Sequence, residues 1–212
     1  LRALSSQLSV ALENSRLFSE AEQKTIDIEH KANSLATLQE LALTINSSLK
    51  LDEILTKTCQ TAVEFFHADH SGLVLFDVDF VQGTIEAEYP KLDTRGLKIP
   101  LRGIPAEEKL IEIHQPLAIY DFQSEETLGA VRDILSNLNI QSVLIVPVIG
   151  KDRLLGSFSL DAIKHQRHFT EEEITLCKTF ADQVAVAIEN ARLFSTLERT
   201  SNHLEGLIAS SL

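Results

Sequence analysis

Phe169-Thr-Glu-Glu-Glu-Ile174 and the run that continues it, Phe180-Ala-Asp-Gln-Val-Ala-Val-Ala-Ile-Glu-Asn-Ala-Arg-Leu-Phe-Ser195, set the architecture of this chain. Thr170 is placed to cap a helix, and Glu173 three residues later completes a capping box, with Phe169 and Ile174 as a hydrophobic staple. No Gly or Pro follows until Gly206, so nothing intrinsic stops the helix earlier. A helix this long exceeds what one small domain needs and predicts a stalk that leaves the domain.

The same helical sequence occurs twice. Residues 7–19 match residues 183–195 at nine of thirteen positions, and the identical positions include charged as well as apolar residues. A fixed offset of this kind indicates a repeated domain. The first copy is therefore predicted to be the tail of a preceding domain, and chance similarity between two amphipathic helices is the alternative.

The composition indicates a folded, acidic chain. Its 212 residues are 44% hydrophobic, which suffices for one domain with long extensions. A net charge of −12, with Lys and Arg scattered singly, argues against a nucleic-acid partner. The longest apolar run, residues 143–149, is too short to span a membrane. Cys59 and Cys177 predict reduced thiols in a cytoplasmic protein rather than a disulfide framework.

Heptad patterns flank the domain. Residues 1–71 contain neither Gly nor Pro, and alternating spacings of four and three connect Leu17, Ala21, Lys24, Ile28, Lys31, Leu35, Leu38, Ala42, Ile45 and Leu49. Because eight of these ten are apolar, the pattern predicts a dimeric coiled coil, with a single helix lying on its own domain as the alternative. The C-terminal helix carries a similar seam, formed by Val186, Leu193, Leu197, Leu204 and Leu207.

Between these helices the pattern predicts alternating helices and strands. We expect a break near Asn46, then a helix capped by Asp52 that ends near Phe66. From His70 the apolar period becomes two. This period and the turn residues predict strands over 71–76, 84–89, 97–101 and 117–120, and helices over 105–114 and 125–138.

The clearest strand signal follows in residues 143–149, a continuous apolar run typical of a strand covered on both faces. Pro147 within it predicts a bulge or an unpaired side. The return strand, residues 154–162, places Gly156, Phe158 and Leu160 on one face and Ser157, Ser159 and Asp161 on the other. One face is expected to pack on helices and the other to line a wetter space. The element order predicts an α+β fold with an antiparallel sheet.

These features together resemble the GAF domain, a small-molecule sensor module related to PAS. The resemblance covers about residues 35–195. It rests on residues 143–150, on Leu154-Leu-Gly-Ser-Phe-Ser-Leu160, on the capped helix start and on the Ala-Ile-Glu-Asn-Ala-Arg-Leu-Phe helix. It implies a six-stranded or similar antiparallel sheet flanked by helices, with the first and last helices on one face and a pocket on the other.

The resemblance also implies a domain plan. Residues 1–34 are then a signalling linker helix, the tail of a preceding GAF repeat; residues 35–195 are the GAF domain; residues 196–212 are an exit helix toward a following module. Such proteins are typically bacterial histidine kinases or cyclases that dimerise through coiled-coil helices. The expected partners are a second copy of the chain, flanking signalling domains and a small molecule, without nucleic acid or membrane.

Comparison with the motifs of ligand-binding subclasses of the family does not identify a ligand for this chain. Members that bind cyclic nucleotides carry an Asn-Lys pair and then Phe, three residues, Asp and Glu. Here Lys164 and Phe169 match, whereas Ile163, Glu173 and Ile174 replace Asn, Asp and Glu. A cyclic nucleotide is therefore not favoured, although Lys164 and Glu173 are still expected to tie the strand end to the helix.

Other cofactors are disfavoured as well. Residues 132–142 contain no Cys for covalent bilin attachment, and two cysteines on distant helices cannot form the cluster of methionine sulfoxide-reducing members. A single histidine, His114, is the only candidate for an axial haem ligand, so haem is not favoured. The pairs His67/His70 and His165/His168 lack a third metal ligand nearby and are expected on the solvated surface. No Ser-His-Asp order, phosphate loop or reactive Cys context is present, so the region is predicted to be non-catalytic.

If a ligand binds, its pocket is expected on the sheet face away from the terminal helices, roofed by residues 105–138. Position alone selects the candidates Tyr120, Asp121, Leu128, Val131, Ser142, Leu144, Ser157 and Ser159. Apolar walls with a few polar anchors are usual for such sites. The alternative is a closed core without a ligand. Two functions follow: a sensor that passes a signal through dimeric linker helices, or a ligand-free dimerisation and spacer module that relays signals from neighbouring domains.

Overall fold

The computed structural model describes residues 13–25, 28, 32, 36, 50–124 and 126–209, with side chains up to His203. The chain divides into two units, Leu1–Glu40 and Leu41–Leu212. In the first unit, residues 13–25 are helical and exposed. Most of the N-terminal seam, the expected break near Asn46 and part of the repeated sequence lie outside the described residues.

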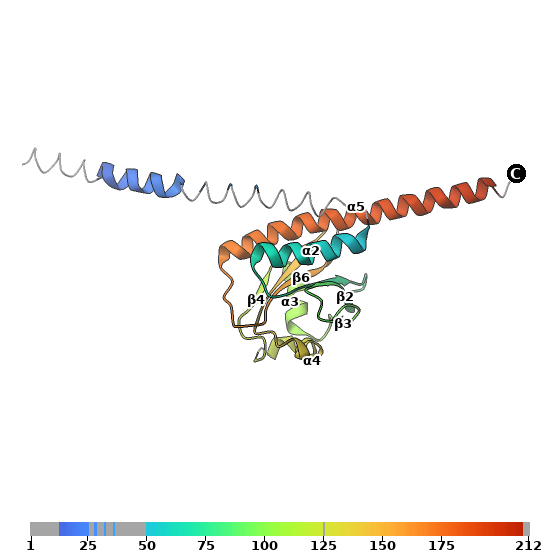
Figure 1. Cartoon of the computed structure of the whole chain (residues 1–212), viewed down its shortest axis with the longest axis horizontal. Helices are drawn as coiled ribbons and strands as arrows, with labels where there is room; N and C mark the ends of the chain where they lie inside the picture. Colours follow the sequence, from blue (N-terminus) through green and yellow to red (C-terminus); the bar gives the residue numbers. More distant parts are fainter. Residues whose placement is uncertain are drawn as a thin grey trace, which may run out of the picture. The chain divides into compact units, whose positions relative to one another are not determined.

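The second unit is built on a six-stranded sheet (Figure 1). Every pair of neighbouring strands is antiparallel, which confirms the predicted α+β architecture. The strands follow the order β3-β2-β1-β6-β5-β4. Their bounds are β1 Ser71–Phe76, β2 Gln82–Tyr89, β3 Lys98–Pro100, β4 Leu117–Ile119, β5 Ser142–Ile149 and β6 Leu154–Ala162.

One face of the sheet carries α2 (Leu51–Phe66) and α5 (Glu171–Ala209), which lie side by side in Figure 1. Aromatic rings join the two helices and the sheet. Phe180 of α5 packs edge-to-face against Phe158 of β6 at 5.6 Å between centroids, and against Phe66 of α2 at 5.9 Å. Such contacts stabilise by about 0.5–1.5 kcal/mol beyond the area they bury.

The opposite face carries α3 (Pro105–Ile113), α4 (Ala130–Ile134) and the 3-10 turns Glu126–Leu128 and Ser136–Leu138. The single helix predicted over residues 125–138 is thus wrong. Gly129 adopts a φ of 46° and Asn139 ends the segment at 52°, conformations that interrupt a right-handed helix.

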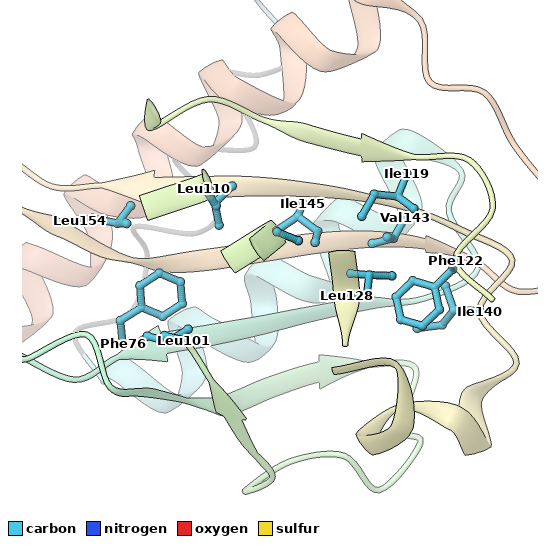
Figure 2. Close-up of a cluster of buried hydrophobic side chains, with 11 residues drawn as sticks. Phe76, Leu101, Leu110, Ile119, Phe122, Leu128, Ile140, Val143, Ile145 and Leu154 are labelled. Atoms are coloured by element: carbon cyan, nitrogen blue, oxygen red, sulfur yellow. The ribbon is translucent and has the colours of Figure 1, made fainter. Parts of the chain in front are cut away.

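A hydrophobic core fills the space between this face and its helices. Figure 2 shows its members, among them Val143 and Ile145 from β5 and Phe122, Leu128 and Ile140 from the roofing segments. Because β5 has helices on both of its faces, all of its residues except Ile149 are buried. This explains the continuous apolar run in its sequence.

The predicted N-terminal cap is confirmed for α5 and is wrong for α2. The Thr170 hydroxyl accepts a hydrogen bond from the Glu173 amide at 3.2 Å, and Glu173 accepts one from the Thr170 amide at 2.8 Å, which confirms the capping box. Asp52, however, is not the cap of α2. Lys50 occupies that position, and Asp52 lies in the first turn, where its charge favours the helix dipole.

Pro147 lies where β5 has a free side. β4 pairs only with Val143, Leu144 and Ile145 of β5, so no strand among the described residues pairs with Pro147 on that side. A missing N–H is tolerated there, in agreement with the prediction from sequence.

Candidate functional site

A cavity of about 60 Å³ lies between the sheet and the segments that contain α3 and α4. Its apolar walls include Val74, Ile85, Phe122, Val131 and Ile145. Since one water needs about 10–15 Å³ by this measure, the cavity has room for several waters or one small organic molecule.

One wall of the cavity is charged. His70, just before β1, and Asp161 of β6 are both buried and both line the cavity. Two backbone hydrogen bonds join them, Asp161 N to His70 O at 2.8 Å and His70 N to Asp161 O at 3.2 Å. Their side chains meet at 2.6 Å between Nδ1 and Oδ2. The strand pairing therefore holds the imidazole in one orientation.

Glu88 of β2 approaches His70 from the other side. Its Oε2 lies 3.7 Å from His70 Nε2, close enough for a charge interaction and too long for a hydrogen bond. Glu88 accepts hydrogen bonds from the Thr94 amide and, at 2.6 Å, from the Thr94 hydroxyl. Burial alone would raise the pKa of Glu88, but these bonds outweigh it and lower the pKa.

The two carboxylates also act on the titration of His70. Burial would lower its pKa, but the hydrogen bond and charge of Asp161, and the charge of Glu88, raise it overall. A charged His70 donates Nδ1–H to Asp161. Its Nε2 is buried and lacks a hydrogen-bond partner among the described residues.

Glu107 lies across the cavity from this wall, in the first turn of α3. Its side chain is buried, and no hydrogen bond or ion pair from another described residue reaches it. Burial raises its pKa from 4.5 to about 7, because a low-dielectric surrounding disfavours the charged form. A solitary acid of this kind is costly in a core and typical of a binding surface.

Three of the predicted site residues line the cavity. Val131 belongs to the α4 wall, and Ser157 and Ser159 lie on the sheet surface beside Asp161. The alternation along β6 is as expected, because Phe158 points to α5 while its neighbours face the cavity. Ligand binding by these residues stays a prediction.

The other five predicted residues lie elsewhere. Tyr120 is exposed and stacks on His168 with 3.8 Å between the ring centroids, and Asp121 is exposed and accepts a hydrogen bond from the Ser124 amide. Leu128 belongs to the adjoining hydrophobic core. The Ser142 hydroxyl donates a hydrogen bond to the Tyr120 carbonyl at 2.6 Å. Leu144 lies between Val143 and Ile145, which line the cavity, and therefore points to the opposite face of the sheet.

Sequence reasoning missed His70 and Glu107 of the cavity, although it placed Asp161 on the wetter face of β6. His70 was expected on the solvated surface, which is wrong: it is 2% exposed. His67, His165 and His168 are exposed as expected. His70 and Asp161 are 91 residues apart, so no local pattern pairs them. The one available signal was Asp161, a charged residue on the face of β6 that also carries two serines.

The expected tie between Lys164 and Glu173 is also wrong. Lys164 pairs with Asp69 at 2.7 Å, and Glu173 pairs with Arg167. Arg167 further donates to the backbone carbonyls of Phe66 and His67. The junction between β6 and α5 is thereby fixed to the end of α2.

Within the part of the chain that the structure describes, no helix combines the length and apolarity needed to cross a membrane. Both cysteines are free and buried, Cys59 on α2 and Cys177 on α5, and neither lines the cavity. Burial raises the pKa of Cys59 to about 12 and also raises that of Cys177. Neither thiol is therefore available as a nucleophile.

Two curated relatives are histidine kinases. The chain is 23% identical over 179 residues to the peroxide stress-activated histidine kinase mak2 of Schizosaccharomyces pombe. It is 24% identical over 182 residues to the circadian input-output histidine kinase CikA of Thermosynechococcus vestitus. Each match covers 79% of this chain, which spans only 7% and 25% of these relatives' lengths.

Solved structures share the fold. The GAF domain of a phosphoenolpyruvate-protein phosphotransferase from Coxiella burnetii has a TM-score of 0.67 at 23% identity, covering 78% of this chain and 98% of that one. Free methionine-R-sulfoxide reductase from Neisseria meningitidis has a TM-score of 0.60 at 17% identity, covering 74% and 88%. The first is one domain of a larger enzyme and the second is an enzyme named for its own reaction, so the fold alone does not decide between binding and catalysis.

The GAF domain family model matches residues 50–188. The matched segment contains the whole sheet, α2, the roof of the cavity and the first half of α5. Together with the antiparallel sheet and its helical layers, this match shows that the chain belongs to the GAF domain family.

Proposed function

We propose that this GAF domain is the regulatory, non-catalytic sensor region of a multidomain signalling protein, and that it binds a small molecule in the cavity. The signal then passes through α5 and the other terminal helix of a homodimer. The histidine kinases among its relatives support a kinase as the output. The buried thiols, which have raised pKa values, support a non-catalytic role.

The observation that carries this proposal is the alternation along β6. Ser157 and Ser159 face the cavity, while Phe158 between them packs on Phe180 of α5. A ligand that displaces the serine side of the strand therefore also shifts the surface on which α5 rests. It changes the equilibrium between two states only by its preference for one of them.

Native mass spectrometry of the purified 212-residue chain tests both parts, because it reports stoichiometry and any retained small molecule. We expect a dimer with a bound mass. Gly72→Val places a side chain in the cavity, since a Cβ there lies 3.7 Å from Ser159 Oγ, and should remove the bound mass without dissociating the dimer. Ala118→Val, on an exposed position of β4, is the matched control and should retain it.

The limited cavity volume favours a second candidate, a ligand-free dimerisation and spacer module. At about 60 Å³ the cavity holds about four to six waters. A dimer without bound mass, whose stability does not respond to small molecules, would support the spacer. A monomeric chain at micromolar concentration would contradict the relay in either form.

A further inference from the structure

The charges around the cavity do not balance. Among the described residues that line it, the charged side chains are His70, Glu107 and Asp161, and no Lys or Arg is among them. Glu88 adds a further carboxylate behind His70. The described residues of this region therefore include three carboxyl groups and one imidazole, and the imidazole already interacts with Asp161 and Glu88.

Among these three carboxyl groups, Glu107 is the one without a partner. It is 5% exposed, lines the cavity and has no hydrogen-bond or ion-pair partner among the described residues. Asp161 and Glu88, by contrast, have His70 and Thr94. A buried carboxyl group without a partner is stabilised most by a donor that carries positive charge.

The remaining surface of the cavity sets the rest of the ligand. Its other walls are mainly aliphatic, with Phe122 as the aromatic member, and hydroxyl groups occur on Ser157, Ser159 and Thr94. An apolar body fits these walls, whereas a carboxylate or phosphate would meet the acidic groups at close range and in a low dielectric.

We propose that the cavity binds a small organic amine, with its ammonium group on Glu107 and its aliphatic part against Val131, Ile145 and Phe122. This inference rests on the proposed sensor function and names the class of its ligand. A chain of about four carbons and one nitrogen matches a volume that holds about four to six waters.

The test is a saturation-transfer NMR titration of the 212-residue chain at pH 8 with n-butylamine, butan-1-ol and butyrate. At this pH the amine is protonated. We expect n-butylamine to bind at least about tenfold more tightly than butan-1-ol, and butyrate not to bind. The Gly72→Val variant should lose the binding of amine and alcohol alike, which places both in the cavity.

Glu107→Gln should reduce the preference for the amine over the alcohol to about one, while Glu112→Gln, an exposed position on the same helix, should retain it. Equal binding of amine and alcohol to the unmodified chain would overturn the amine proposal and leave the sensor function intact. A preference for butyrate would do the same. If none of the three compounds binds, the amine proposal is overturned, whereas the sensor function is decided separately by the bound mass in native mass spectrometry.

Discussion

At the scale of single residues, His70 lies between two buried carboxylates that reach it from β6 and β2. A buried charge is tolerated only when it is paired and its hydrogen bonds are satisfied. Asp161 and Thr94 provide these bonds on the wall. Glu107 lacks such a partner. A ligand that pairs with Glu107 would therefore stabilise the fold more than one that binds the paired His70–Asp161 wall.

Glu107 should make stability depend on pH. Its pKa is about 7 in the fold and 4.5 as the ordinary value, so between these values the folded chain binds more protons than the unfolded chain. The free energy of unfolding therefore falls as the pH rises through this window. The difference between 7 and 4.5 corresponds to about 3 kcal/mol.

Glu107→Gln removes this dependence. In urea denaturation of the ligand-free chain, the variant should gain stability over the unmodified chain on going from pH 5 to pH 8, by up to about 3 kcal/mol. The exposed control Glu112→Gln should show no such gain. A difference that is the same at both pH values would contradict the burial of an unpaired acid.

Gly156 should be intolerant of a side chain. It pairs with Leu75 across the β1–β6 ladder, and a Cβ at this position would collide with the backbone carbonyl oxygen of Val74. Since backbone in the middle of a sheet cannot yield cheaply, Gly156→Ala should lower the free energy of unfolding by about 1–3 kcal/mol. Gly72→Ala, whose Cβ meets only ordinary contacts, is the control, and an equal loss in both would argue against the collision.

At the scale of elements, the junction before α5 brings three segments together. Arg167 donates to the end of α2 and to Glu173, its own amide donates to Ser142 at the start of β5, and its guanidinium lies 5.1 Å from the Phe169 ring centroid. The capping box then fixes the first turn of the helix. These contacts tie the start of α5 to β5 and α2 and so support the proposed relay through α5.

Loss of the cap should weaken this junction. Thr170→Ala removes the hydroxyl that accepts the Glu173 amide and should cost about 1 kcal/mol of stability. Amide hydrogen exchange in the first turn of α5 should also become faster. Thr196→Ala, further along the same helix and exposed, should do neither, and equal effects of the two substitutions would contradict a special role for the cap.

At the scale of the whole molecule, α5 is longer than the sheet requires. Its 39 residues span about 58 Å, and in Figure 1 its C-terminal half extends past the sheet. Along that half Leu193 and Leu197 are 64% and 69% exposed. Leucines four residues apart on one exposed helix face are what a coiled-coil partner would bury.

Leu197→Asp should dissociate the proposed dimer. The new charge would either be buried in the seam or keep the two helices apart. Sedimentation velocity should therefore show a dissociation constant of the dimer that is at least about tenfold higher. Ser195→Asp adds the same charge on the exposed helix but off the seam, and should leave the dimer intact. A shift of similar size in both would point to net charge rather than the seam.

The features that can be predicted from the sequence alone are those whose signals are local. The capping box, the bounds of β1 and β6, the two faces of β6 and the membership in an antiparallel α+β fold all follow from the spacing of neighbouring residues. Each of these depends on the period of the chain or on a contact three or four residues away.

Only the tertiary structure decided the composition of the cavity. His70, Glu88 and Asp161 meet because β1 lies between β2 and β6 in the sheet, and Glu107 reaches the same space from a helix that packs over it. The orientation of Leu144 and the break at Gly129 were likewise set by which layer covers which face. Contacts between residues far apart in sequence leave no periodic trace, because each side chain appears locally as an isolated polar residue.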